Sequence, residues 1–346
     1  MKMTFAVGTG RNERIHEIAG IARTAEESGF EYLTFLDSQN VSRDIYAMLT
    51  ISAVNTHRIK LGHGVTVPVT RHPSVTANAT ATVDELSGGR AFVGLGAGWS
   101  AVWTMGKKPS RVQEVRDTVQ FIKKYTAGEE AEWQGAKMHS EWIRHPLKVY
   151  IGCAGPRMLQ MAGEVADGVI LSSSFGINPI AMKWKLEHIY RGAEKAGRDP
   201  ATIDIWARAM MYVTDSTEQA VREVSGYAVN SALSTIMQFQ KPTPEVEELK
   251  KRMIKAYPWL MDDCKKVHDV YEPYMHERAD TAAARQVTKR LIDIYHMAGT
   301  PDDIAEKVAK IGELGIKTIA TTLYSIVDKN GMMRKIGDKV MPYFRN

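Results

Sequence analysis

The sequence predicts a (β/α)8 barrel, in which eight parallel strands alternate with helices. The chain has 346 residues, which suits one elaborated barrel, because such domains average about 250 residues and exceed about 400 with insertions. About eight strand-like segments alternate with helix-like segments along it. Strand-like runs such as AFVGLG (91–96) and VILSS (169–173) are apolar on both faces, as buried parallel strands should be. An open, doubly wound sheet is the alternative.

The first half of the chain alternates regularly between the two kinds of segment. An apolar run at Met3–Gly8 precedes a helical pattern that begins after Asn12, a favourable helix cap, and stops at Gly29. Three more units follow, with strands expected at Tyr32–Leu36, Ile59–Val67 and Arg90–Gly96 and helices at Asp44–Asn55, His72–Leu86 and Arg111–Tyr125.

The second half continues this alternation with one interruption. Strands are expected at Leu147–Ile151, Gly168–Leu171, Ile203–Val213 and Ile316–Leu323, and helices at Pro156–Ala166, Ile180–Ala196 and Asp302–Leu314. The segment 216–296 is charged and helical in pattern, without a convincing strand. We therefore expect a single domain, 1–346, with a helical insertion at 216–296 between the seventh and eighth strands. This insertion should cover the barrel mouth, because it leaves near the C-terminal end of a strand.

Composition excludes several classes of protein. Hydrophobic residues make up 44% and charged residues 25%, which is typical of a globular protein and not of a disordered or fibrous chain. No apolar run approaches the length of about 18 residues that spans a bilayer, and the N-terminus lacks the apolar core of a signal peptide. The 45 basic and 40 acidic residues are scattered, so nucleic-acid binding is not expected. Two cysteines, Cys153 and Cys264, exclude a disulfide framework and favour the cytoplasm.

The active site of such a barrel lies at the C-terminal ends of its strands. These ends are rich in glycine and small hydroxyl residues, at 8–10, 62–66, 94–98, 152–156 and 172–174, and the sixth end is Asp37-Ser38-Gln39. Glycine lets the backbone approach a ligand, and the N–H groups of the following helix bind anions. The set predicts a large ligand that carries a phosphate, although each loop alone is also an ordinary barrel turn.

Several familiar motifs fail on inspection. The run Gly94–Trp99 lacks the third glycine of the dinucleotide fingerprint, and 152–158 lacks the Gly-Lys-Ser/Thr of a nucleotide P-loop. Neither a metal-binding histidine pair nor a Gly-x-Ser-x-Gly nucleophile is present. The small neighbours of Cys153 favour a tight backbone site over a catalytic thiol. Few charged side chains remain for chemistry, which suits a cofactor that carries its own reactivity, such as a flavin or deazaflavin.

Two carboxylates are the candidates for a catalytic role. Asp37 follows the second strand, where it would act as an acid, a base or a hydrogen-bond acceptor; a turn or helix cap is an equally good interpretation. Glu13 lies at the start of the first helix, where the helix dipole stabilises a carboxylate in any case.

Four stretches of the chain resemble the bacterial luciferase-like superfamily. They are AEESGFEYLTFLD (25–37), IKLGHGVTVPVTRHPSVTANATATVDELSGGRAFVGLGAG (59–98), VYIGCAGPRMLQMAGEVADGVILSSS (149–174) and AGTPDDIAEKVAKIGELGIKTI (298–319). They are most similar to the branch that depends on coenzyme F420, a deazaflavin, and that includes methylenetetrahydromethanopterin reductases and an alcohol dehydrogenase. The resemblance covers nearly the whole chain except the insertion.

The resemblance implies a homodimer or higher oligomer and a cofactor at the barrel mouth. The cofactor ring would lie against a bulge at Gly64, Val65 and Thr66, with a cis peptide bond at Gly64–Val65, Val65 behind the ring and Thr66 bonded to its edge. The remaining cofactor-binding candidates are Gly96 and Gly98, and, for the phosphate, Gly152, Cys153, Ala154, Gly155, Pro156, Ser172, Ser173 and Ser174. The branch usually has Asp-His after the second strand, whereas this chain has Asp37-Ser38, so a histidine proton donor is absent there.

Three functions therefore compete. The first is an F420-dependent oxidoreductase that transfers a hydride between the deazaflavin and a small organic or pterin-type substrate, as a methylenetetrahydromethanopterin reductase does. The second is a monooxygenase that uses reduced FMN and oxygen. The third is a flavin-binding protein without catalysis. The glycine-rich loops suit all three, and only the resemblance favours the first.

Overall fold

Eight parallel strands close into a barrel in the computed structural model, which describes residues 1–240, 243–272 and 279–345. The barrel strands are β1 (Thr4–Thr9), β2 (Tyr32–Phe35), β3 (Lys60–His63), β4 (Ala91–Gly96), β7 (Val149–Cys153), β8 (Gly168–Leu171), β9 (Asp204–Ala209) and β12 (Thr318–Thr322). Each pairs with its neighbours in the order of the chain, and β12 closes the ring on β1. The predicted fold class is therefore confirmed.

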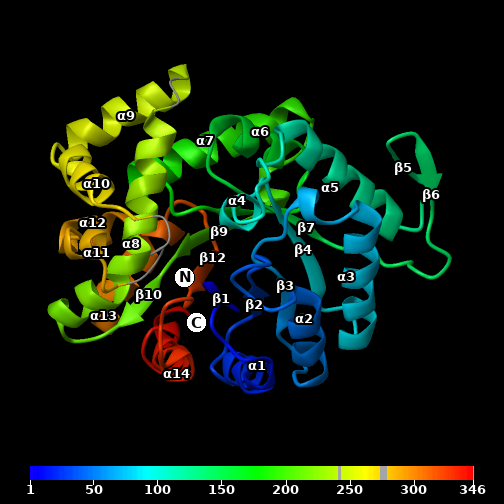
Figure 1. Cartoon of the computed structure of the whole chain (residues 1–346), viewed down its shortest axis with the longest axis horizontal. Helices are drawn as coiled ribbons and strands as arrows, with labels where there is room; N and C mark the ends of the chain where they lie inside the picture. Colours follow the sequence, from blue (N-terminus) through cyan, green and yellow to red (C-terminus); the bar gives the residue numbers. More distant parts are fainter. Residues whose placement is uncertain (241–242, 273–278, 346) are drawn as a thin grey trace.

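Helices surround this barrel, as the apolar outer faces of its strands require (Figure 1). They are α1 (Ile18–Glu27), α2 (Ile45–Val54), α3 (Pro73–Ser87), α4 (Ser100–Trp103), α5 (Val112–Thr126), α6 (Pro156–Val165), α7 (Pro179–Lys195), α13 (Pro301–Gly312) and α14 (Lys329–Lys339), with 3-10 turns η1 (Ile15–Glu17), η2 (Pro68–Thr70), η3 (Pro200–Thr202) and η5 (Met341–Phe344). Local signals set their ends: Asp44 caps α2, Thr300 and Pro301 begin α13, and α3 ends at Gly88 in the left-handed region.

Aromatic side chains fill the inside of the barrel. Tyr32, Phe92, Tyr150 and Trp206 pack with ring centroids 4.6 to 5.8 Å apart. Val65 packs against the same cluster from the segment that follows β3. The barrel is thus solid below Val65, and a ligand has room only at the mouth.

Between the seventh and eighth barrel strands, the described residues form five helices. They are α8 (Thr217–Phe239), α9 (Pro244–Ala256), α10 (Leu260–Asp269), α11 (Ala282–Arg285) and α12 (Lys289–Tyr295). They gather on one side of the molecule (Figure 1), and the described part of 216–296 contains no strand. Residues 241–242 and 273–278 of the expected insertion lie outside the described residues. A short parallel pair, β10 (Met211–Val213) and β11 (Met297–Gly299), joins the two ends of this segment.

Four features differ from the sequence-based expectation. The strand expected at Ile203–Val213 is divided in two, because β9 ends at Ala209 and β10 pairs with β11 outside the barrel. The first long helix begins at Ile18, not after Asn12, because Asn12 N–H donates to Glu13 within the loop that follows β1. The strand expected at Ile59–Val67 ends at His63. A hairpin, β5 (Ala131–Trp133) and β6 (Ala136–Met138), projects from the barrel (Figure 1).

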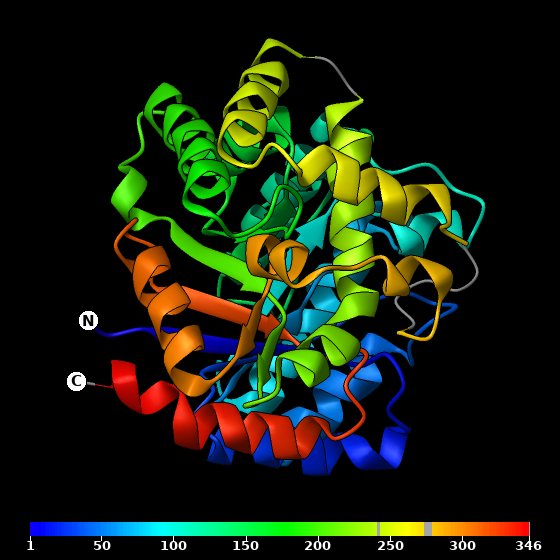
Figure 2. The ribbon, with the colours of Figure 1, turned by 90° about the vertical axis from the view of Figure 1, so that its left-hand side faces the viewer.

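Both termini lie on the same side of the molecule (Figure 2), where Met3 N–H donates to the carbonyl of Phe344 at 3.3 Å. In the part of the chain that the structure describes, no helix combines the length and the apolar character needed to cross a membrane.

Candidate active site

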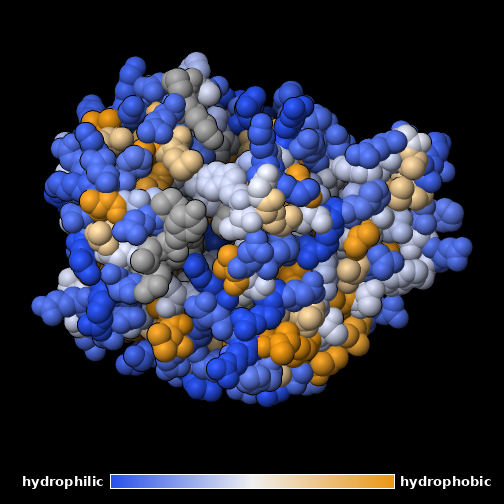
Figure 3. Space-filling view, viewed as in Figure 1, coloured by the Kyte–Doolittle hydropathy of each residue, from blue (hydrophilic) through white to orange (hydrophobic). Residues whose placement is uncertain are grey.

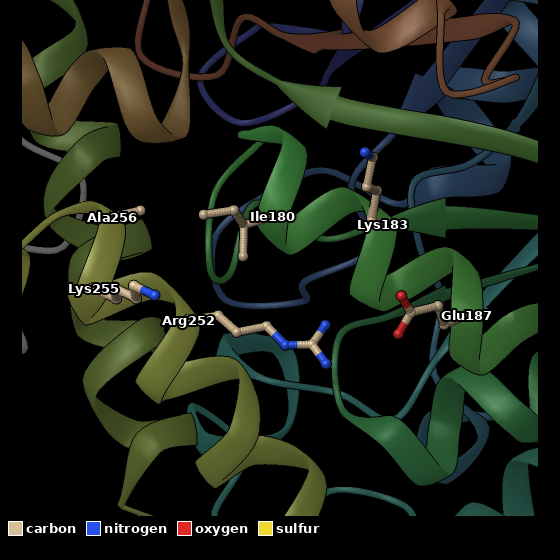
Figure 4. A pocket seen from close by; sticks show the side chains of 6 residues that line it. All are labelled: Ile180, Lys183, Glu187, Arg252, Lys255 and Ala256. Atoms are coloured by element: carbon tan, nitrogen blue, oxygen red, sulfur yellow. The ribbon is translucent and has the colours of Figure 1, made fainter.

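A cavity of about 1770 Å³ opens at the C-terminal ends of the barrel strands. Most of the predicted site residues line it: Asp37, Gly64, Val65, Gly96, Gly98, Gly152, Cys153, Ala154, Gly155, Pro156, Ser172, Ser173 and Ser174. Residues of α8 also line it, among them Tyr227, Asn230 and Ser234, so the helical segment contributes to the mouth as expected. A smaller hollow of about 500 Å³ lies between α7 and α9 and contains no residue from a strand end (Figure 4).

The peptide bond between Gly64 and Val65 is cis, as predicted. Val65 faces the cavity and packs over two glycines of neighbouring strands. A Cβ atom at Gly96 would lie 2.8 Å from Val65 Cγ2, and one at Gly152 would lie 3.0 Å from Val65 Cγ1. On the other side, Tyr324 Oη donates to the carbonyl of Gly64 at 3.2 Å. These contacts present Val65 as an apolar platform at the base of the cavity.

Thr66 is placed differently from the expectation. Its backbone joins β4, because its N–H donates to Gly94 at 2.8 Å and its carbonyl accepts from Gly96 N–H at 2.9 Å. Its hydroxyl is buried and donates to Asp37 Oδ2 at 2.5 Å, and Thr66 does not line the cavity. The side chain therefore holds a carboxylate, and because it is buried outside the lining it does not reach the cavity in which a ring would lie.

Asp37 is buried and fully engaged by neighbours. Arg71 donates to both of its oxygens, at 2.5 and 3.3 Å, and Gln39 Nε2 donates to Oδ1 at 2.8 Å. With Thr66 this makes four donors on one carboxylate. The arrangement fits a charged anchor that fixes the loop after β2 better than a free base.

Glu13 lies behind the cavity wall and does not line the cavity. It accepts from Thr9 Oγ1, from the N–H groups of Gly10 and Asn12, and pairs with Lys329 at 3.0 Å. Burial works to raise the pKa of this carboxyl, but Lys329 and these donors outweigh it and lower the pKa. Glu13 is thus an ionised group that ties the loop after β1 to α14.

The predicted phosphate region combines a helix start with a hydroxyl cluster. Gly155 precedes α6, and no side chain caps the first turn of that helix, which faces the cavity. The serines of 172–174 bond one another and α8: Ser173 Oγ lies 3.0 Å from Ser231 Oγ, and Ser174 Oγ lies 2.5 Å from Ser234 Oγ. Backbone N–H groups, hydroxyls and the neighbouring Arg157 together suit an anionic group.

Two buried groups support this region from below. Lys185 on α7 donates from Nζ to the carbonyls of Ser172 at 2.9 Å and Gly176 at 3.0 Å. Burial lowers the pKa of Lys185 to about 7. Burial raises the pKa of the Cys153 thiol to about 12, so this cysteine remains protonated and is no nucleophile at neutral pH.

Sequence reasoning missed several residues of the cavity. Trp99 and Trp103 pack against each other in the segment after β4, with ring centroids 4.4 Å apart and ring planes tilted by 42°. Arg208, Tyr227 and Tyr324 lie deeper. Arg208 had a usable signal, because it is the only charged residue between Ile205 and Val213 and occupies an inward position, two residues after Trp206. The two tyrosines had none, because only the closed barrel brings them together.

Comparisons with known proteins agree with this geometry. The family model described as luciferase-like monooxygenase matches residues 2–318. The 5,10-methylenetetrahydromethanopterin reductase of Archaeoglobus fulgidus is 30% identical over 352 residues, covering 98% of this chain and 99% of the relative. The enzyme of the same name from Methanolobus tindarius is 29% identical over 348 residues, covering 98% and 100%.

A solved structure shares the fold. The coenzyme F420-dependent tetrahydromethanopterin reductase of Methanopyrus kandleri superposes with a TM-score of 0.81 and 24% identity, covering 99% of this chain and 100% of the other. The likeness therefore extends through the helical segment between β9 and β12.

Proposed function

This chain belongs to the luciferase-like monooxygenase family, and within that family we propose that it is a coenzyme F420-dependent oxidoreductase. The reaction is hydride transfer between the deazaflavin and a small organic or pterin-type substrate, as in methylenetetrahydromethanopterin reductases. The full-length similarity to reductases of that name carries the proposal, and the similar enzyme from Methanopyrus kandleri is named F420-dependent.

The residues at the mouth fit a flat ring that carries a phosphate tail. Val65 offers an apolar surface over glycines at 96 and 152, where any side chain would push against it. The start of α6 and the serines 172–174 offer N–H and hydroxyl donors for the phosphate. A reduced 5-deazaflavin bound there supplies a hydride, and the protein supplies binding, orientation and electrostatics.

The chain itself then has three tasks in the reaction. Val65 would support the ring of the cofactor at the base of the cavity. Asp37 and Arg71 hold the loop after β2 in one conformation, so that the wall of the cavity is already formed before a ligand arrives. Trp99 and Trp103 present flat, half-exposed surfaces at the rim, which suit a planar substrate such as a pterin.

Binding measurements separate this function from its FMN-dependent competitor. We expect purified protein to bind F420 and to bind FMN at least about tenfold more weakly. Reduced F420 should then be oxidised on addition of methylenetetrahydromethanopterin or methylenetetrahydrofolate without oxygen, with one deazaflavin consumed per product. Tight FMN binding with oxygen consumption would establish a monooxygenase, and binding of either cofactor without turnover of any substrate would favour a carrier.

We further propose that two copies of the chain associate through α2 and α3. Hydrophobic side chains gather over these helices at the lower right of Figure 3, and Val54, Val75 and Leu86 are about half exposed. Because α2 is apolar on several faces, it needs a partner surface besides the barrel.

Two assignments accompany this function. We treat 1–346 as one domain with 216–296 inserted in it, because α8 shares the cavity with the barrel. We place the protein in the cytoplasm, where its free cysteines, both buried, match a reducing environment.

A further inference from the structure

Arg208 projects from β9 into the cavity and is half-buried. Its Nη2 donates to Tyr227 Oη at 3.2 Å, and its guanidinium carbon lies 5.7 Å from the ring centroid of Tyr324. Its Nε atom is buried and has no hydrogen-bond partner. Among the described residues no carboxylate forms an ion pair with it. Two tyrosines thus surround a cation that has no counter-ion in the described part of the chain.

Burial of an unpaired charge is costly, so proteins pair such charges or use them to bind ligands. The wider cavity does not supply the missing negative charge. Among the described residues that line it, five are arginines (Arg11, Arg111, Arg116, Arg157 and Arg208) and two are carboxylates, Asp37 and Glu245. Arg116 is paired with Glu164 and Asp37 with Arg71, and both of these partners lie outside the lining. The cavity is therefore electropositive before a ligand enters it.

The position of Arg208 differs from that of the other anion-binding groups. The serines 172–174 and the start of α6 follow β8 and β7, whereas Arg208 belongs to β9. In the closed strand order, β9 lies four strands from β3 in either direction, so it is opposite the strand that ends in the Val65 platform. Arg208 thus comes from the strand opposite the one that ends in Val65, and Tyr324 lies between the two: its ring centroid is 5.7 Å from the Arg208 guanidinium carbon, and its Oη donates to the Gly64 carbonyl at 3.2 Å.

We propose that Arg208, with Tyr227 beside it, forms an oxyanion-binding subsite that holds a negatively charged oxygen of the bound ligand. A planar guanidinium with free N–H groups suits a carboxylate, a phosphate or an enolate-like oxygen. The phenol of Tyr227 orients the guanidinium and can offer its proton to the same oxygen. Because Tyr227 belongs to α8, the subsite joins the barrel to the helical segment.

Two sources can provide this oxygen. One is an anionic group of the substrate, which the position of Arg208 on the strand opposite Val65 favours. The other is the deazaflavin itself: a hydride carries two electrons and one proton, so its arrival makes the ring one charge more negative. The second source rests on the proposed function, whereas the subsite as such requires only the cavity.

The test compares the whole protein with Arg208→Met, which keeps the length of the side chain and removes its charge. Arg208→Lys keeps the charge but not the planar guanidinium. Arg252→Met is the matched control, because Arg252 on α9 lines the smaller hollow (Figure 4) and not the main cavity. The first arm measures dissociation constants for oxidised and for reduced F420. The second measures binding of benzoate and of inorganic phosphate by calorimetry, with and without oxidised F420.

If the oxygen belongs to the cofactor, Arg208→Met should weaken the binding of reduced F420 at least about tenfold more than the binding of oxidised F420. This difference lowers the reduction potential of bound F420 by about 30 mV. A substrate source predicts that this ratio is unchanged and that benzoate or phosphate binding to the F420 complex falls at least about tenfold. Arg208→Lys should lie between, and Arg252→Met should match the wild type. Equal values for wild type and Arg208→Met in both arms would overturn the subsite.

Stability provides a readout independent of any cofactor. If Arg208 serves a ligand, ligand-free Arg208→Met should melt no lower than the wild type, because it lacks a buried unpaired cation. A fall in Tm by more than about 4 °C would instead show that Arg208 stabilises the folded barrel. If the wild type binds no F420 at all, the proposed function fails, while the anion titrations of the ligand-free protein still decide on the subsite.

Discussion

Arg71 donates hydrogen bonds from both Nη atoms to the carboxylate of Asp37, at 2.5 and 3.3 Å, and the hydroxyl of Thr66 donates to the same carboxylate. Asp37 is only 3% exposed. The pair joins the loop after β2 to the loop after β3, directly beside the cis peptide at Gly64–Val65. The aspartate that follows the second strand thus supports the segment that carries Val65.

We expect Arg71→Met to lower the free energy of unfolding by about 2–4 kcal/mol, because it leaves a buried carboxylate without its cation. Urea unfolding at neutral pH measures this loss. Adding Asp37→Asn to Arg71→Met should recover part of it, since the amide needs no counter-ion. A change below about 0.5 kcal/mol in Arg71→Met would show that the ion pair does not hold the loop.

The glycine at 152 gives a second prediction. A methyl group there would press on Val65 Cγ1 at 3.0 Å, so Gly152→Ala should move the platform and weaken cofactor binding about tenfold or more. Val65→Ala in the same chain should relieve the contact and restore much of the affinity. Gly20→Ala is the matched control, because a Cβ there has no neighbour within 4 Å and helical alanine is favourable. Equal cofactor affinity in Gly152→Ala and Gly20→Ala would contradict this account of the platform.

Most of the barrel could be predicted from local signals. Strands β8 and β4 have strong apolar runs, and caps or glycines end the helices next to them. The hairpin β5–β6 was missed because its three-residue strands are too short to show alternation, although Gln134 and Gly135 adopt the positive φ angles of a tight turn. The strand predicted for β3 was too long, because Val65 and Val67 continue an apolar run past the cis peptide.

The site was predictable only where the backbone forms it. The glycines at 64, 96 and 152 indicate positions where another group lies close to the backbone, and this signal is present in the sequence. The partners of side chains lie far along the chain: Ser173 meets Ser231, and Asp37 meets Arg71. No spacing rule connects such pairs, so the assignment of Thr66 to the ring and the view of Asp37 as a free acid or base lacked the information that the closed barrel supplies.

Self-association through α2 and α3 can be tested directly. We expect Val54→Glu together with Val75→Glu to convert the oligomer to a monomer in light scattering, because both side chains are more than half exposed on the proposed interface. Val327→Glu is the control, since Val327 is 96% exposed and lies outside these helices. A monomeric wild type, or an oligomer that survives the double substitution, would refute this interface.

His63 predicts a dependence of stability on pH. The imidazole is completely buried beside Tyr46, and neither nitrogen has a hydrogen-bond partner within 3.5 Å. Burial lowers the pKa of His63 to about 4, and burial also lowers the pKa of His296 to about 3. Below the unfolded pKa of about 6.5, these histidines bind protons in the unfolded chain but not in the folded chain. Stability should therefore fall as the pH drops from about 6.5 towards 4.

Removal of His63 should flatten this dependence. We expect His63→Leu to be more stable than the wild type by about 1 kcal/mol at pH 8, because no unsatisfied nitrogen remains buried, and by on the order of 3 kcal/mol near pH 4.5. Chemical unfolding at several pH values gives both numbers. His57→Leu provides the control, because His57 is exposed. A pH slope that is the same in His63→Leu and wild type would mean that His63 protonates freely in the folded protein.

Lys185 predicts a proton linked to binding at the phosphate region. It lies buried beneath the serine loop with a pKa lowered to about 7 by burial, so above this pH the ligand-free protein loses a positive charge there. A bound phosphate favours the charged form, and the cofactor should therefore bind with uptake of a proton at pH 8 and with an affinity that falls as the pH rises through 7. Lys185→Met should bind about tenfold more weakly at pH 6, because the carbonyls of Ser172 and Gly176 lose their donor, and should show neither effect of pH. Calorimetry in two buffers of different ionisation enthalpy measures the proton uptake directly.

Lys183→Met is the control, because Lys183 lies on the exposed side of the same helix (Figure 4), and it should behave as the wild type. Proton uptake that persists in Lys185→Met would assign the titrating group elsewhere and reduce Lys185 to a structural clamp.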